Sequence, residues 1–261
     1  MEAGQQTVLL RVSAAVRRRA AGLVLALALV GTSSVGRGTA HDTGTLIAVF
    51  ATRTEILLCS DGRVVNSVSR ATIRDDWPKI HRLTDLTGLL TAGRDLPRLR
   101  DQFAAKLGNQ RPQAVSAVAT VLRGALEAGW TALTLEAGRA PAGRAFAVVA
   151  GFDADGPARL FYMDSASKPP FLLQPVSLFA TGQDLEVFAI SSNVDANEDV
   201  SSLLVRHVDA LVRAQPGADR RRLMLAAFAA AKQELATRNT SIGGDTFAAV
   251  ITPAGGYEPL R

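Results

Sequence analysis

Thr45, Asp61 and Lys79 carry side chains that could perform nucleophilic chemistry, and each stands at the end of a short apolar run. Thr45 opens one run, Asp61 closes the next, and Lys79 opens the segment after that. A hydroxyl, a carboxylate and an amine at the ends of neighbouring strands can meet at one edge of a sheet. They could then support catalysis by the hydroxyl, because a weak nucleophile needs an adjacent base and a lysine of tuned pKa. By themselves these residue types are commoner at turns and solvated strand ends, so the elements around them must decide.

The runs at 44–50 and 55–59 are each short enough for a strand, and residues 51–54 between them suit a hairpin turn. A later strand, 87–93, ends in Gly93, where the backbone can approach a ligand closely. Further strands are predicted at 145–152, 158–164, 171–173, 176–180, 246–252 and 257–259. Helices are predicted at 96–107, from after 112 to about 137, as a short helix after 181–184, and at 199–214 and 219–237.

These elements predict an α+β fold. Strands grouped in hairpins imply antiparallel sheets, and helices that arrive in pairs imply covering layers. The simplest assembly has two antiparallel sheets packed face to face with helices on both outer faces, which is a four-layer α-β-β-α sandwich. We expect a single domain from 45 to 261, because the final strands need the earlier hairpins as partners.

The composition of the 261-residue chain fits one folded domain and argues against several functions. Hydrophobic residues make up 48% of the chain, so it can bury a sizeable core. Aromatic residues are only 5%, and no basic stripe interleaved with aromatics occurs, so we expect no nucleic-acid binding. The histidines at 41, 81 and 207 give no metal-ligand spacing, and we expect neither a metal nor another cofactor. Cys59 stands alone in an apolar run, where a small core residue fits.

The first forty residues have the organisation of a secretory signal. Arg17-Arg18-Arg19 precedes the apolar run 20–30, and Gly38-Thr39-Ala40 offers small residues to a signal peptidase. We therefore expect export to the periplasm or the extracellular space, with a short propeptide, 41–44, ahead of the domain. The run is too short to span a bilayer comfortably, although an uncleaved anchor stays open as the one contact with a membrane. A mis-assigned start codon, which would leave a cytoplasmic protein, stays open too.

Several motifs follow one another in a characteristic order. They are the Gly44-Thr45 junction, Ser60-Asp61-Gly62-Arg63, Lys79, Thr91-Ala92-Gly93, the paired runs 146–153 and 160–164, and Ser241-Ile242-Gly243-Gly244. In their order and spacing, from Gly44 to about Glu258, the chain resembles the proteasome β-type subunits and the related bacterial ring peptidase. These proteins are N-terminal-nucleophile (Ntn) hydrolases. The resemblance implies the four-layer sandwich and a hydrolase that cleaves its own chain before a threonine.

The resemblance implies a role for each candidate site residue. Thr45 matches the nucleophilic threonine, at the family's spacing from Asp61, whereas Thr43 would require a two-residue insertion. Lys79 matches the catalytic lysine, and Gly93 matches the glycine whose N–H faces the developing oxyanion. The supporting residues are Thr181, in place of a serine that helps to orient the terminal amine, Arg63, which matches an arginine of the supporting shell, and Asn239 and Ser241 in the loop after the last long helix.

The implied chemistry suits these residue types. After cleavage of the Gly44–Thr45 bond, Thr45 carries a free α-amine whose reference pKa, about 7.7–8.0, suits proton transfer near neutrality. Its hydroxyl would attack a carbonyl while Lys79, held by Asp61, favours the alkoxide. The expected substrate is a peptide or another amide.

Two departures from the family keep other functions open. The family has an aspartate shortly before the Ser-Gly-Gly segment, where this chain has Asn239, and it favours further threonines where this chain has Leu46-Ile47. An amide can hydrogen-bond but cannot hold negative charge. A catalytically inactive subunit or scaffold and a small-molecule amidase on the same fold are the alternatives to a threonine peptidase. The helices do not distinguish a homo-oligomeric ring from a monomer.

Overall fold

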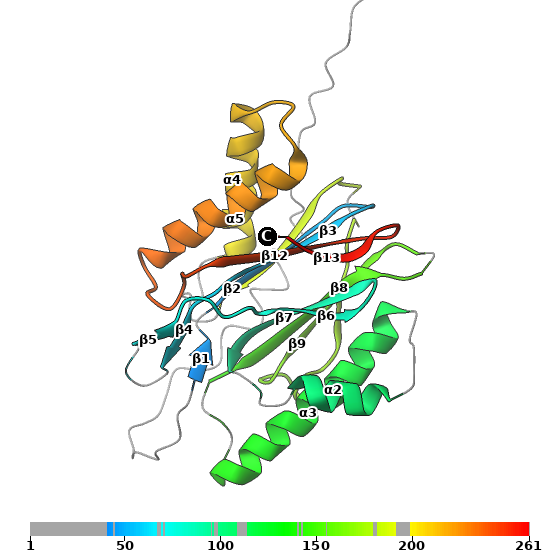
Figure 1. The fold of residues 1–261 in the computed structure, drawn as a ribbon, viewed down its shortest axis with the longest axis vertical. Helices are drawn as coiled ribbons and strands as arrows, with labels where there is room; N and C mark the ends of the chain where they lie inside the picture. The colour runs from blue at the N-terminus through cyan, green and yellow to red at the C-terminus, as the bar shows by residue number, and fades with distance from the viewer. Residues whose placement is uncertain are drawn as a thin grey trace, which may run out of the picture.

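The structure, a computed structural model, describes residues 41–43, 45–66, 69, 71–94, 96, 99–108, 114–139, 141, 143–154, 156–179, 182–191 and 199–260. It has a mixed α+β architecture, as the sequence predicts, and the strand pairs among these residues are antiparallel (Figure 1). The expected signal segment, 1–40, lies outside the described residues, as does Gly44 of the expected propeptide.

The smaller sheet, in the order β11–β2–β3–β12–β13, places Thr45 and Asp61 at one end of a hairpin. Its strands are β2 (Leu46–Ala51), β3 (Ile56–Asp61), β11 (Glu186–Ser191), β12 (Thr246–Thr252) and β13 (Gly256–Leu260). β2 and β3 form the hairpin that the sequence predicts. Both strands are buried along their whole length, which explains why they are continuous apolar runs instead of alternating ones.

The larger sheet runs in the order β10–β9–β8–β7–β1–β4–β5, and β6 pairs with β7 outside this path. Its strands are β1 (His41–Thr43), β4 (Val64–Asn66), β5 (Thr72–Arg74), β6 (Ile80–Thr84), β7 (Thr87–Arg94), β8 (Ala145–Phe152), β9 (Ala158–Asp164) and β10 (Gln174–Val176). β1 is an interior strand, because Asp42 lies opposite Val65 on one side and Arg94 on the other. The residues just before Gly44 therefore complete this sheet.

The apolar core lies in layers on either side of each sheet. One cluster joins the smaller sheet to α4 (Val200–Ala214) and α5 (Arg220–Ala236), and another fills the space between the two sheets. A further cluster joins the larger sheet to α2 (Leu99–Leu107) and α3 (Val115–Ala137). Successive residues of β2 alternate between clusters, because side chains of a strand point to opposite faces. Figure 1 shows the two helix pairs on opposite sides of the sheets.

Local hydrogen bonds set the helix ends that the sequence predicts. The Asp199 carboxylate accepts the N–H groups at the start of α4, and the Asp219 carboxylate accepts the N–H of Arg222 at the start of α5. α3 ends at Gly138, which adopts a φ of 64° and donates its N–H to Leu135 O. The helices predicted to about 137, at 199–214 and at 219–237 are confirmed to within one or two residues.

Three predicted elements are wrong. The strand predicted at 176–180 lies earlier, as β10 (Gln174–Val176), and residues 177–179 belong to no strand. Residues 186–191 form the strand β11, paired along β2, where the sequence predicts a short helix. Val187, Phe188 and Ile190 favour a strand, and β2 would otherwise present an unpaired edge. Residues 171–173 form a turn instead of a strand, because Phe171 adopts a φ of 56° and packs its buried ring against Trp130.

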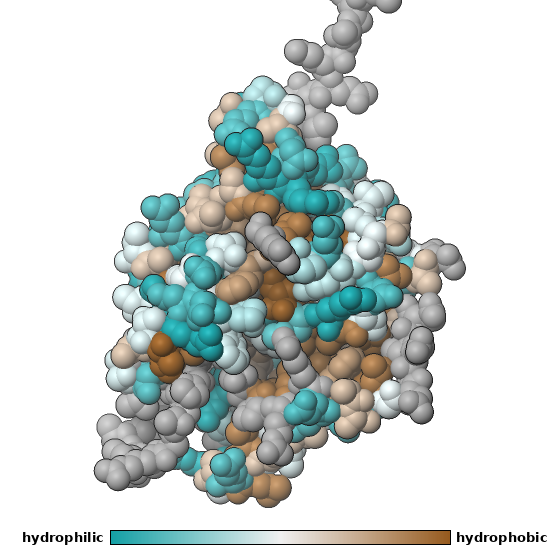
Figure 2. All heavy atoms as spheres, viewed as in Figure 1, coloured by the Kyte–Doolittle hydropathy of each residue, from teal (hydrophilic) through white to brown (hydrophobic). Residues whose placement is uncertain are grey.

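Figure 2 shows the same face with its side chains. Hydrophilic residues cover much of α4 and α5, and apolar residues reach the surface in the middle, between the levels of β12 and β7. Among the described residues, no helix combines the length and the apolar character needed to cross a membrane.

Candidate active site

Lys79 and Asp61 form an ion pair in the interior. Lys79 Nζ lies 2.7 Å from Asp61 Oδ1, and the two side chains are 1% and 0% exposed. Asp61 ends β3 and Lys79 directly precedes β6, so both sheets contribute to the pair. Lys79 Nζ also donates to Arg63 O at 2.8 Å. A buried ammonium and a buried carboxylate persist when each is paired and hydrogen-bonded, and this geometry meets that condition.

Asp61 uses both of its carboxylate oxygens. Oδ1 also accepts the N–H of Leu46 at 3.1 Å, and Oδ2 accepts the N–H of Gly243 at 3.0 Å. These donors come from the start of β2 and from the loop that precedes β12. Together with Lys79 they hold the carboxylate in one orientation from separate parts of the chain.

Thr45 lies beside this pair. The nitrogen of Leu46, 3.1 Å from Asp61 Oδ1, is bonded to the carbonyl carbon of Thr45, so the Thr45 backbone borders the carboxylate. Thr45 itself is fully buried. The structure therefore brings the threonine, the carboxylate and the amine to the same end of neighbouring strands, where the sequence predicts that they meet.

Gly93 lies on β7, opposite Thr43 of β1. Thr43 is two positions before Thr45 in the sequence. The φ of Gly93 is 79°, a left-handed conformation that residues with a side chain rarely adopt. A methyl group added at Gly93 would lie 2.0 Å from Arg144 O, so glycine is required here. The backbone that could receive an oxyanion is thus held in a fixed, kinked conformation near Thr45.

Arg63 fastens the loop that donates to Asp61. Arg63 Nε lies 2.6 Å from Asp75 Oδ1, and its guanidinium donates to Thr240 O at 3.1 Å. The N–H of Arg63 donates to Gly243 O at 3.1 Å. Arg63 therefore holds the loop by side chain and backbone at once, and this keeps the Gly243 N–H facing the carboxylate.

Asn239 and Ser241 shape the turn that leads from α5 into this loop. Asn239 Oδ1 accepts the Ser241 N–H at 3.0 Å and the Ser241 hydroxyl at 2.6 Å. Asn239 O accepts the N–H of Ile242 at 3.0 Å. The two residues thus bind each other in the turn that precedes the loop whose Gly243 N–H donates to Asp61. Thr181, the remaining predicted site residue, lies outside the described residues.

Burial shifts the pKa values of both members of the ion pair. It lowers the pKa of Lys79 below its ordinary value, and the attraction of Asp61 opposes this shift. It raises the pKa of Asp61, and the Lys79 ammonium and the N–H groups of Gly243 and Leu46 oppose that. The pH range in which Asp61 and Lys79 are both charged is therefore narrower than it is for an aspartate and a lysine in free solution. Perturbed ionisable groups of this kind gather at functional sites.

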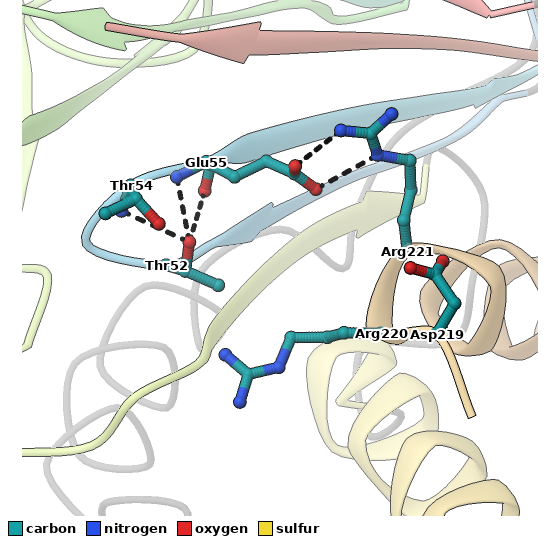
Figure 3. Close-up of a pocket in the computed structure, with 6 residues that line it drawn as sticks. All are labelled: Thr52, Thr54, Glu55, Asp219, Arg220 and Arg221. Carbon is teal, nitrogen blue, oxygen red and sulfur yellow. Dashed lines mark hydrogen bonds and ion pairs between the residues drawn. The ribbon is translucent and has the colours of Figure 1, made fainter. Parts of the chain in front are cut away.

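A separate polar pocket of about 350 Å³ lies between the β2–β3 turn and the start of α5 (Figure 3). There Arg221 points toward Glu55 and pairs with its carboxylate at 2.6 Å. The turn is at the other end of β2 and β3 from Asp61, roughly 15–20 Å away for strands of this length. The pocket is therefore distinct from the candidate site. The described residues contain no group of His, Cys, Asp and Glu that could hold a metal ion.

The sequence singles out Gly243 only as part of the motif at 241–244 and gives it no role, and it does not identify Leu46 or Asp75 as partners of this site. Gly243 and Leu46 contribute backbone N–H groups, which almost every residue has, so no residue type marks them. The adjacent glycines at 243 and 244, between a helix and a strand, mark the loop in the sequence but do not show which N–H reaches Asp61. Asp75 becomes recognisable only when the fold brings it to Arg63.

Gly244→Ala should destabilise the protein by about 1–3 kcal/mol or more. Gly244 adopts a φ of 71°, and an added methyl group would lie 2.4 Å from Asp75 O, so both backbone strain and a steric clash oppose the change. Urea unfolding measures the loss.

Gly217→Ala is the matched control. Gly217 has a similar φ of 86°, but no described atom lies within 4 Å of the added methyl group. The difference between the two variants isolates the contact with Asp75. If the two variants lose the same free energy of unfolding, the loop at Gly244 is not in close contact with Asp75.

Comparison of the chain with models of known protein families finds none that matches, and comparison with curated proteins finds no relative. The chemistry of the site is therefore argued from its own residues.

Proposed function

We propose that this protein is a threonine-type Ntn hydrolase with the four-layer sandwich of proteasome β-type subunits. It cleaves its own Gly44–Thr45 bond and then hydrolyses peptides or other amides. Thr45 is the nucleophile, Lys79 and Asp61 are its partners, and Gly93 receives the oxyanion. The supporting residues are Arg63, Thr181, Asn239 and Ser241.

The observation that carries the proposal is the buried Lys79–Asp61 pair against the backbone of Thr45. Stability does not explain such a pair, because apolar residues of similar volume often stabilise a core as well or better. Its position beside a threonine that follows a glycine favours a chemical role. A lysine whose pKa is lowered by burial is suited to hold or move a proton near a nucleophile.

In the proposed mechanism, the Thr45 hydroxyl gives its proton to the free α-amine of the same residue as its oxygen bonds to the substrate carbonyl carbon. The Lys79 ammonium, held by Asp61, stabilises the developing negative charge. The N–H of Gly93 donates to the tetrahedral oxyanion, and loss of such a donor typically costs about 3–4 kcal/mol. The leaving amine takes the proton from the α-ammonium, and water then hydrolyses the acyl-enzyme.

The pairing of β1 supports a peptide substrate. β1 is antiparallel to both β4 and β7, and it leads directly to Thr45. After its release, β4 and β7 would face each other across two strand spacings, about 9–10 Å. An extended peptide could bind there through main-chain hydrogen bonds, with its scissile carbonyl near Gly93.

An inactive subunit or scaffold is the second candidate, and Asn239 favours it. The resemblance places an aspartate here, whereas the amide oxygen of Asn239 accepts two hydrogen bonds from Ser241. A neutral side chain could not hold negative charge near the α-amine. This candidate predicts an uncleaved Gly44–Thr45 bond. A small-molecule amidase would instead be cleaved and hydrolyse an acyl-amide but no peptide.

Intact mass and N-terminal sequencing of the wild-type protein, fractionated by compartment, test the proposal. We expect an exported protein that begins at Thr45. A purified exported protein that begins at His41 and hydrolyses neither peptides nor acyl-amides would overturn the proposed function. A cytoplasmic protein that begins at Thr45 would contradict only the export. Native mass spectrometry of the same sample distinguishes a ring from a monomer.

The alkaline limb of hydrolysis should depend on Lys79. Because burial lowers the pKa of Lys79, kcat/KM should decline with rising pH before the reference lysine pKa of about 10.4 is reached. Asp61 opposes this shift, so Asp61→Asn should move the decline to a still lower pH. Profiles of kcat/KM for both proteins, from neutral to strongly alkaline pH, provide the check. Identical alkaline limbs would contradict the coupling between the two residues.

A further inference from the structure

Lys232, on α5, reaches the loop that holds Asp61. α5 packs apolar residues against the smaller sheet, including Ala231 and Leu235, and Lys232 is half-buried at the border of this face. Its Nζ donates to Gly244 O and to Thr246 Oγ1, each at 2.7 Å. The ammonium therefore ties α5 to the point where the loop becomes β12.

The loop depends on bonds from outside because it is built on two glycines. Gly243 and Gly244 adopt φ values of 150° and 71°, and neither has a side chain that could fix its position. The N–H of Gly243 reaches Asp61 Oδ2 at 3.0 Å, and the carbonyl of the next residue is the one that Lys232 holds. A shift of Gly244 would therefore move the Gly243 N–H away from the carboxylate.

The charges around Lys232 favour the same arrangement. The Lys232 ammonium is attracted by the carboxylates of Asp61, Asp75 and Asp245, and it is repelled by the Arg63 guanidinium. Burial lowers the pKa of Lys232, and these carboxylates act in the opposite direction. The Gly243 N–H that this loop carries opposes the rise in the pKa of Asp61, so holding the loop in place favours the ionised form of Asp61, which Lys79 binds through its Oδ1.

We propose that Lys232 is a positioning residue for Asp61. By holding Gly244 and Thr246 against α5, it keeps the Gly243 N–H directed at the carboxylate that pairs with Lys79. The kinetic consequence of this role rests on the proposed function, but the positioning of the carboxylate does not. Lys232 acts through the loop and through Asp61 and is not itself a catalytic residue.

The test compares Lys232→Met, which removes the donors and the charge, with Lys232→Arg, which keeps both. Two NMR measurements on the full chain need no turnover: hydrogen exchange of the Gly243 amide, and the pH titration of the Asp61 carboxyl carbon. In Lys232→Met we expect exchange at Gly243 to be at least about tenfold faster and Asp61 to titrate at a higher pH, with partial return in Lys232→Arg. If Thr45 is active, kcat should fall roughly ten- to a hundredfold with little change in KM.

Lys106→Met, which removes an exposed lysine from α2, is the control and should match the wild type in every measurement. Wild-type exchange and titration in Lys232→Met would overturn the proposal, whatever the activity. If both change as expected and the wild type shows no hydrolysis that depends on Thr45, the positioning stands and the proposed function fails. If Lys232→Met does not fold, Lys232→Gln, which keeps an amide donor without the charge, replaces it. Faster exchange alone or a higher titration pH alone would support one half of the role. The absence of both changes would overturn the proposal.

Discussion

Replacing Thr45 with Ala is expected to leave the chain uncleaved before position 45 and to reduce hydrolysis by roughly 10⁴-fold or more. The substitution removes the hydroxyl that, in the proposed mechanism, attacks the Gly44–Thr45 bond and later the substrate, and loss of a nucleophile has effects of this size in other hydrolases. The Lys79–Asp61 pair and the Leu46 N–H that Asp61 accepts remain in place. Intact mass measures cleavage, and a fluorogenic amide measures turnover.

Thr43→Ala is the control for this experiment. Thr43 pairs with Gly93 as part of β1, so its substitution should permit cleavage at the normal position. Thr45→Ser, which keeps a hydroxyl, should retain cleavage and part of the activity. If Thr45→Ala is processed and active while Thr43→Ala is not, the nucleophile is Thr43. If both substitutions leave an uncleaved and unchanged protein, the chain is an inactive subunit.

Lys79→Met should destabilise the folded protein by about 3–5 kcal/mol at neutral pH and abolish hydrolysis. The variant leaves the fully buried Asp61 carboxylate without its counter-ion, and breaking a buried ion pair in this way has a cost of that order. Urea unfolding at neutral pH, together with thermal unfolding, gives the loss. A loss below about 1 kcal/mol would show that the two side chains are not an interior pair.

The loss should become smaller at acid pH. Without Lys79, the pKa of Asp61 in the folded state rises further above its value in the unfolded state, about 3.9. Such a group is most favourable to folding below the unfolded pKa, and this contribution is lost as the pH rises through the folded pKa. The double variant Asp61→Asn/Lys79→Met removes both charges and should be more stable than Lys79→Met at neutral pH, yet equally inactive. A double variant as unstable as the single one would contradict the electrostatic explanation.

The fold is predictable from the sequence where burial is continuous. β2 and β3 appear as unbroken apolar runs because both of their faces are covered, and α3 and α5 show helical spacing against the sheets. The short strands are not predictable. β5 is exposed at every position, so it has no alternating pattern of apolar residues that would mark it as a strand, although it pairs with β4 only a few residues earlier in the chain.

The candidate site is predictable only in its side chains of marked chemistry. Asp61 and Lys79 can be identified from their types and from the order of the motifs, and the structure brings them together. The two glycines mark the loop at 243–244, but no residue type shows that the Gly243 N–H donates to Asp61. Lys232 resembles any lysine on a surface helix until α5 is placed against the loop. Long-range packing decides these contacts, and sequence patterns describe only local structure.

The interior position of β1 has a consequence for the exposure of backbone hydrogen-bonding groups in this sheet. While β1 is in place, the backbone groups of β4 and β7 that face it are paired within the sheet. Loss of β1 would expose two rows of unpaired N–H and C=O groups, and such strand edges promote aggregation by pairing with strands of other chains. If the chain is cleaved before Thr45 as proposed, β1 would keep these backbone groups paired until cleavage, and cleavage would expose them as it frees the Thr45 amine.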